Sequence, residues 1–158
     1  MKLLLLRHGD AENKSTTGKD FDRKLSEVGR RQALLVKEQI DALNFLHDAS
    51  IYCSNAQRTK DTWNIIKGET IDTATYKDEL YLASLNQLLT FFWENKQPNN
   101  MLFIGHNNGI SELASYLLNE NVVLPTCGML LIDFPTFTSF SEISKGTGTL
   151  IKFHFPDN

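Results

Sequence analysis

The chain has 158 residues, and 16 Lys and Arg residues against 19 Asp and Glu residues give it a formal net charge of −3. This length fits one domain with its own core, and 41% hydrophobic with 22% charged residues is ordinary for a globular protein, which argues against disorder. The acidic excess argues against a general nucleic-acid binder. Two cysteines are too few for a disulfide framework or a structural zinc site. The apolar runs are too short for a signal peptide or a membrane span.

Short apolar segments alternate with amphipathic segments along the chain. Residues 2–6 form a continuous apolar run, the pattern of a strand buried on both faces. Ser26 can cap a helix in which Ala33, Val36, Ile40 and Leu43 recur on one face. Further strands are expected at residues 50–53, 70–76, 101–105, 129–134 and 149–155. Further helices are expected at residues 57–67, where Gly68 ends the helix, and over the apolar stripes of residues 85–92 and 110–117.

This alternation predicts one α/β domain over residues 1–158, with a central mostly parallel sheet and helices on both faces. In such folds functional residues gather at the carboxyl ends of the strands. The polar stretch of residues 10–24 is too long for an ordinary connection, and long loops in compact domains tend to be functional.

Two histidines and two arginines follow the expected strands. Arg7, His8 and Gly9 come after the first strand, Arg58 after the second, and His106 after the strand at residues 101–105. This set suits phosphoryl transfer, which needs positioning and electrostatic stabilisation of three charged oxygens.

Each residue type has a role in that chemistry. The guanidiniums of Arg7 and Arg58 would bind the oxygens, and a protonated His106 would add a donor. The neutral ring of His8 would attack in line. Gly9 would let the backbone pass close to the anion, and amides near Gly109 would add donors. The arginines neutralise the charge, so no metal or other cofactor is expected.

The motifs around these residues resemble the histidine phosphatase, or phosphoglycerate-mutase-like, superfamily, and within it the small bacterial phosphohistidine phosphatases. The RHG signature in LLLLRHGDAE carries the resemblance, together with RKLSEVGRRQA, IYCSNAQRTKDT, DELYLAS, LFIGHNNGISELASYL and LPTCGMLLIDF, in the same order along the chain. The resemblance implies the three-layer fold of that family, His8 as nucleophile, and Arg7, Arg58 and His106 as the rest of the phosphate pocket.

A general acid is harder to identify. Many members of the family carry one between the positions matching Arg58 and His106, where Asp78 and Glu79 lie; we take Glu79 as the candidate, with Asp10 as another. A pocket without a strong acid favours an imidazole leaving group, whose conjugate acid has a pKa of about 6.5, over an alkoxide. Arg23, on the long loop, is a candidate for contact with a phosphoprotein.

The preferred function is a metal-independent phosphatase acting on phosphohistidine of a protein. A small-molecule phosphomonoesterase and a non-catalytic phosphate-binding module are the alternatives. The resemblance implies a histidine-containing phosphotransfer protein as substrate, with neither nucleic acid nor membrane as partner. We expect a cytoplasmic protein, and the sequence leaves its oligomeric state open. His47 and His154 have no motif around them, so we expect structural roles for both.

Overall fold

The strands of the chain pair into one sheet with the order β3-β2-β4-β1-β5-β6. The computed structural model describes residues 1–69, 73–96 and 99–156. Within these ranges the strands are β1 (Lys2–Arg7), β2 (Ala49–Ser54), β3 (Thr75–Lys77), β4 (Asn100–Gly105), β5 (Met129–Asp133) and β6 (Thr149–His154). Each lies where the sequence predicts a strand; of the expected strand at residues 70–76, residues 70–72 lie outside the described ranges.

The sheet is mostly parallel. β1 pairs in parallel with β4, and β2 pairs in parallel with both β4 and β3. β5 alone runs in the opposite direction, because it is antiparallel to both of its neighbours, β1 and β6. The carboxyl ends of β1, β2 and β4 therefore meet at one edge of the sheet, as the predicted topology requires.

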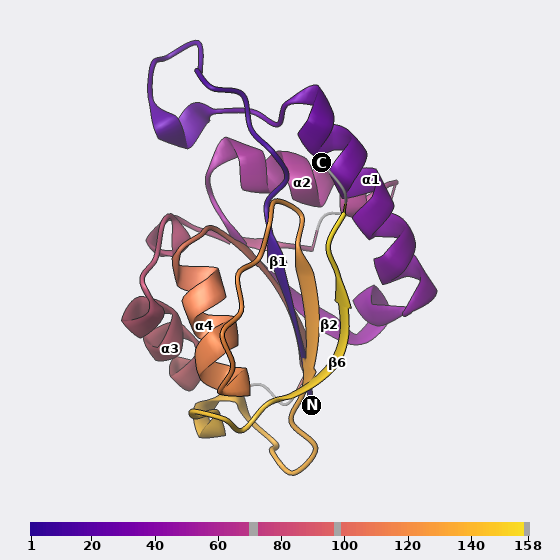
Figure 1. Ribbon diagram of the computed structural model, residues 1–158, viewed down its shortest axis with the longest axis vertical. Coiled ribbons are helices and arrows are strands. Elements are labelled where there is room, and N and C mark those ends of the chain that lie inside the picture. Colours follow the sequence, from indigo (N-terminus) through magenta and orange to yellow (C-terminus); the bar gives the residue numbers. More distant parts are fainter. Residues whose placement is uncertain (70–72, 97–98, 157–158) are drawn as a thin grey trace.

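Helices cover both faces of the sheet and complete three layers, as predicted. They are α1 (Glu27–Ala42), α2 (Gln57–Lys67), α3 (Leu85–Glu94) and α4 (Gly109–Leu118), with short 3₁₀ turns η1 (Asp20–Asp22), η2 (Phe45–Asp48), η3 (Asp78–Leu80) and η4 (Phe140–Glu142). Figure 1 shows α3 and α4 on one side of the sheet and α1 on the other. The Ser26 side chain caps α1 by accepting a hydrogen bond from Gly29 N, and Gly68 ends α2 with a positive φ, both as predicted.

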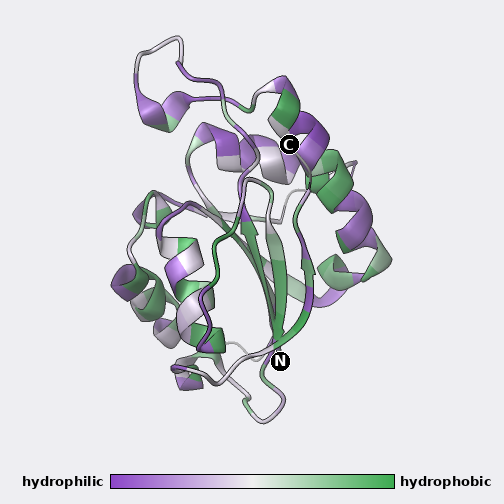
Figure 2. Ribbon diagram, viewed as in Figure 1, coloured by the Kyte–Doolittle hydropathy of each residue, from purple (hydrophilic) through white to green (hydrophobic). Residues whose placement is uncertain are grey.

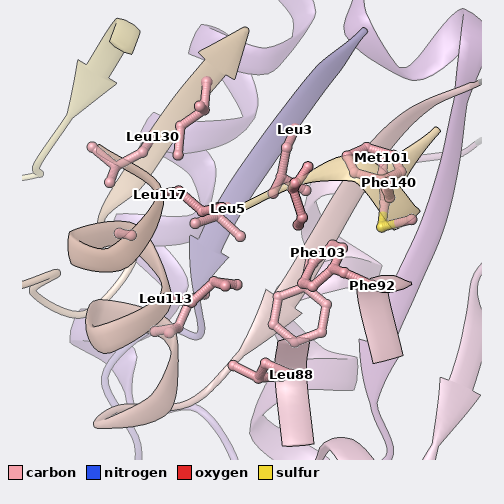
Figure 3. Packing of buried hydrophobic residues seen from close by; sticks show 14 of the residues in the cluster. Leu3, Leu5, Leu88, Phe92, Met101, Phe103, Leu113, Leu117, Leu130 and Phe140 are labelled. Carbon is pink, nitrogen blue, oxygen red and sulfur yellow. The ribbon is translucent and has the colours of Figure 1, made fainter. Parts of the chain in front are cut away.

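β1 divides its leucines between two cores. Leu3 and Leu5 pack with residues of α3 and α4, whereas Leu4 and Leu6 pack with residues of α1 and α2. Figure 3 shows the first of these cores, and Figure 2 shows the apolar strands between helices of mixed hydropathy. Burying each leucine contributes about 1.5–3 kcal/mol relative to leaving it exposed. The end of β1, where Arg7 and His8 lie, is therefore firmly anchored.

A loop over residues 11–24 follows β1 and projects beyond its carboxyl end (Figure 1). An isolated antiparallel bridge between Ala11 and Leu25 closes its base. Gly9 and Gly29 allow the start of α1 to pack against the chain after β1, since a Cβ on Gly9 would lie 2.7 Å from Gly29 O and one on Gly29 2.0 Å from Asp10 O. Close backbone packing, rather than room for an anion, thus explains Gly9.

Candidate active site

A cavity of about 340 Å³ opens at the carboxyl ends of β1 and β4, beside the loop over residues 11–24. It brings together the four residues that the sequence places at strand ends, along with Arg23 and Asp10. Its lining comprises Arg7, His8, Asp10, Ala11, Asp20, Arg23, Arg58, Leu82, His106, Asn107 and Thr126.

His8 is fixed in one tautomer by its own backbone surroundings. Its amide donates to Gly105 O at 3.2 Å, and its ring Nδ1 donates to Gly9 O at 2.7 Å. The proton therefore sits on Nδ1, and Nε2 keeps a lone pair, which accepts from Arg58 Nε at 3.2 Å. Burial, with the positive charges of Arg58 and Arg7, lowers the pKa of His8 to about 3. His8 is thus a neutral, oriented base near neutral pH.

Arg58 lies in the first turn of α2 and is buried. Besides its contact with His8, its Nη1 donates to Asp20 O at 2.7 Å and its Nη2 to Asp20 Oδ2 at 2.9 Å. Thr62, one turn further along α2, accepts from Gly9 N at 3.1 Å and donates to Arg58 O at 2.7 Å. This hydroxyl ties the helix that carries Arg58 to the segment that carries His8.

Arg7 ends β1, and its Nη1 donates to Leu124 O at 2.9 Å. Its Nε is buried without a hydrogen-bond partner. Burial and the charge of Arg58 lower the pKa of Arg7, yet an arginine remains charged at neutral pH. An unpaired buried N–H of this kind is costly, and an anion in the cavity would satisfy it.

His106 directly follows β4, and its ring centroid lies 5.0 Å from that of His8. Its Nε2 lies 2.8 Å from Ser54 Oγ, while its Nδ1 is buried without a partner. Burial, then the neighbouring His8 and Arg58, lowers the pKa of His106 to about 2. Burial therefore favours the neutral ring over the protonated His106 expected from the sequence. When the Ser54 hydroxyl donates to Nε2, the neutral ring carries its proton on Nδ1 and can still donate it.

Asp20, on η1, is a cavity residue that sequence reasoning missed. Its Oδ2 accepts from Arg58 Nη2 at 2.9 Å and from the Tyr81 hydroxyl at 2.5 Å, and its Oδ1 accepts from Arg23 Nη1 at 2.8 Å. The bonds from Tyr81 and Arg23, with the charge of Arg58, hold the pKa of Asp20 well below its usual range. Only the length of the loop hinted at such a residue, because no local motif shows where the loop folds back.

Glu79 is not brought to the cavity. Its carboxylate pairs with Lys77 Nζ at 2.8 Å, and its side chain is 64% exposed. Asp78 accepts from Asn55 Nδ2. Both belong to η3, and its Leu80 is the residue that turns inward. The structure therefore corrects the expectation that Glu79 supplies a proton here, and of the candidate acids only Asp10 lines the cavity, where its carboxylate accepts from the Ser26 hydroxyl at 2.5 Å.

Three further expectations concern residues near the cavity or outside it. Arg23 lines the cavity as anticipated, held by Asp20. The start of α4 is not among the lining residues: a Cβ on Gly109 would lie 1.9 Å from Ala83 O, so this turn is packed against the chain before α3. His47 lies outside the cavity and pairs with Asp48.

Within the residues that the structure describes, no group of three or more His, Cys, Asp or Glu side chains is placed to hold a metal ion. Across the same ranges, no helix has both the length and the apolar character needed to cross a membrane. The thiols of Cys53 and Cys127 are both buried in the core.

Comparison with known proteins places this geometry in context. Residues 3–81, half of the 158-residue chain, match the sequence profile of the histidine phosphatase superfamily (branch 1). An uncharacterised chloroplastic protein of Arabidopsis thaliana is 24% identical over 145 residues, which span 84% of this chain and 66% of that protein.

Solved structures resemble the chain over nearly its whole length. A candidate phosphohistidine phosphatase, SixA, from Agrobacterium tumefaciens superimposes with a TM-score of 0.80 at 23% identity, covering 98% of both chains. The protein histidine phosphatase SixA in complex with tungstate gives 0.76 at 16% identity, covering 97% of this chain and 96% of that one. A mycobacterial glucosyl-3-phosphoglycerate phosphatase gives 0.65 at 16% identity, covering 94% and 96%. Likeness at these identities establishes a common fold.

Proposed function

This chain belongs to the histidine phosphatase superfamily and is a phosphatase, and we propose that it hydrolyses phosphohistidine of a protein through a phosphohistidine intermediate on His8. One observation carries the proposal: the lone pair of His8 Nε2 borders the cavity beside Arg58, with Arg7 and His106 in the same lining. A neutral imidazole held in that tautomer is a competent nucleophile towards phosphorus.

The phosphoryl oxygens would be held by groups that already lie in place. Arg7 Nε is a buried donor without a partner, and Arg58 uses three of its five N–H groups on His8 and Asp20. His106 Nδ1 is also buried without a partner, and it is a donor when the Ser54 hydroxyl donates to Nε2. Donors fixed in a buried site stabilise the charge that develops in a transition state without reorganising. An incoming dianion would also raise the pKa of His106, favouring a further donor.

The reaction proceeds in two displacements. His8 Nε2 forms a bond to phosphorus as the bond from phosphorus to the substrate nitrogen breaks, and that electron pair stays on the leaving imidazole. Nδ1–H of His8 continues to donate to Gly9 O, which stabilises the positive charge on the phosphorylated ring. Water then attacks phosphorus, its proton is lost to solvent, and the electron pair of the breaking bond returns to Nε2.

The environment of the carboxylates supports phosphohistidine as the substrate class. Asp20 is ionised and hydrogen-bonded to two arginines and a tyrosine, so it is not poised to protonate an alkoxide, and the Asp10 carboxylate accepts from Ser26. An imidazole departs without such help when its other nitrogen is protonated. Arg23 and the half-exposed Leu82 border the opening, where a protein surface such as a histidine-containing phosphotransfer domain would contact the chain.

A small-molecule phosphomonoesterase is the second candidate. The cavity volume of about 340 Å³ favours it, since this is within the range of small-ligand sites. The two functions differ in their preferred leaving group rather than in their phosphate pocket.

A substrate panel on the wild-type chain and the His8→Ala variant tests the proposal. The panel compares a phosphohistidine-containing protein with phosphoserine, a sugar phosphate and para-nitrophenyl phosphate. We expect the highest kcat/KM on phosphohistidine, and loss of all activity in His8→Ala but not in His47→Ala, whose site is an exposed histidine. Faster turnover of sugar phosphates would favour the second candidate, and full activity in His8→Ala would exclude the intermediate.

A further inference from the structure

We propose that Asp20 is a specificity-determining residue whose carboxylate accepts a hydrogen bond from the protonated ring of the substrate phosphohistidine. In this role Asp20 selects N-phosphoryl substrates with a cationic ring over O-phosphomonoesters. The inference rests on the proposed function, because it explains how the same phosphate pocket would distinguish the two substrate classes.

The position of Asp20 fits the leaving-group side of the cavity. One guanidinium, that of Arg58, separates it from the nucleophile: Nε faces His8 Nε2 at 3.2 Å, and Nη2 faces Asp20 Oδ2 at 2.9 Å. His8 is buried, whereas the Asp20 side chain is 45% exposed. An in-line displacement puts the leaving group on the far side of phosphorus from His8, towards the open part of the cavity.

The carboxylate has room for one more donor. Its two oxygens offer about four lone-pair sites, and they accept from Arg58, Arg23 and Tyr81. Arg58 on α2, Arg23 on the loop and Tyr81 after η3 together keep the carboxylate ionised. His106, which is neutral, is a further titratable group that faces it. Asp20 is thus an acceptor for a cation rather than a proton donor.

Protonation of the leaving ring makes cleavage of the P–N bond easier. If the distal ring nitrogen carries a proton, the electron pair of the breaking bond neutralises the ring, and a neutral imidazole departs. Without that proton an imidazolate would have to leave, which is far more basic. By accepting from the distal N–H, Asp20 raises the protonated fraction of the bound substrate, and the proton stays on the departing ring.

The same charge acts against oxygen esters. An O-phosphomonoester has no proton for Asp20 to accept, and its departing oxygen develops negative charge. Because the ionised carboxylate lines the same cavity, its charge opposes the negative charge on the departing oxygen and raises the barrier. Asp20 therefore favours one substrate class and opposes the other, whereas a residue that merely held Arg58 in place would affect both equally.

The test compares Asp20→Asn with a matched control, Asp22→Asn, in the full chain. Asp22 belongs to the same 3₁₀ turn and carries the same charge, but it accepts from Thr17. The probes are a phosphohistidine peptide and para-nitrophenyl phosphate. A hydrogen bond to a charged group is worth about 1.5–3 kcal/mol, or about 10- to 100-fold, so Asp20→Asn should lower the ratio of kcat/KM on the peptide to kcat/KM on para-nitrophenyl phosphate by that factor.

The pH profile separates specificity from structure. For the peptide, the pH above which kcat falls should move down by about one to two units in Asp20→Asn, since a 10- to 100-fold loss in stabilising the protonated ring equals one to two units. Asp22→Asn should match the wild type in both measurements.

An equal loss on both substrates, or an unmoved pH profile, overturns the role of Asp20 while the proposed function stands. A wild-type chain that prefers para-nitrophenyl phosphate instead overturns the proposed function itself. Asp20→Glu, which restores the charge, should recover the preference for the peptide.

Discussion

The two buried histidines predict a loss of stability in mild acid. Burial lowers the pKa of His8 to about 3 and that of His106 to about 2, against about 6.5 in the unfolded chain. Between these values the unfolded state binds a proton on each ring and the folded state does not. Stability therefore rises with pH in this window and falls as the pH drops below about 6.5.

The magnitude follows from these pKa values. Lowering the pH from 7 to 5 should reduce the free energy of unfolding by about 2 kcal/mol for each histidine, or about 4 kcal/mol together. The carboxyl of Asp20, whose pKa is lowered from 3.8, adds stability that is lost only below that value, outside this pH range. Between pH 7 and pH 5, His8 and His106 therefore account for most of the change in stability that comes from the cavity.

Urea unfolding at pH 7 and pH 5, followed by the fluorescence of Trp63 and Trp93, measures the effect. His8→Asn and His106→Asn should each shrink the pH-dependent loss by about 2 kcal/mol, whatever their stability at pH 7. His47→Asn, at an exposed position outside the cavity, controls for the exchange of a histidine for an asparagine. The reasoning is refuted if His8→Asn loses as much stability as the wild type between the two pH values.

Three further predictions concern single residues. Arg58→Lys removes the forked donor that contacts His8 and Asp20, so kcat/KM should fall about 100-fold on every substrate, and steady-state rates near wild type would contradict this role. Glu79→Gln should leave kcat/KM unchanged across the same substrates, because Glu79 is exposed and pairs with Lys77; a tenfold loss would restore it as an acid. Gly29→Ala should destabilise the chain by about 1–3 kcal/mol in thermal unfolding, since its Cβ would meet Asp10 O at 2.0 Å; an unchanged Tm would disprove the close packing.

The sequence was enough to predict the residues set by topology. Arg7, His8 and His106 directly end or follow β1 and β4, and parallel strands bring such positions together whatever the details of packing. Arg58 does not directly follow a strand, but it lies in the first turn of α2, which begins at the same edge of the sheet.

What the sequence could not predict depends on burial and on the path of the loop. His106 is neutral because it is enclosed beside His8 and Arg58, and no motif reports such an environment. Asp20 reaches Arg58 across 38 residues of sequence only because the loop folds back. Glu79 was chosen for its place along the chain, but the 3₁₀ turn η3 points it towards solvent.

The cavity has a floor and a wall of different origin. Strand ends scattered along the chain build the floor, whereas residues 11–23, one continuous stretch, supply Ala11, Asp20 and Arg23 to the wall. A floor assembled from distant segments resists change, because each part is also held in the core. The wall is formed by a single loop, which the Ala11–Leu25 bridge closes at its base. Replacing this loop would therefore change the contacts of Arg58 in the reaction centre as well as the wall of the cavity, because Asp20 bonds Arg58.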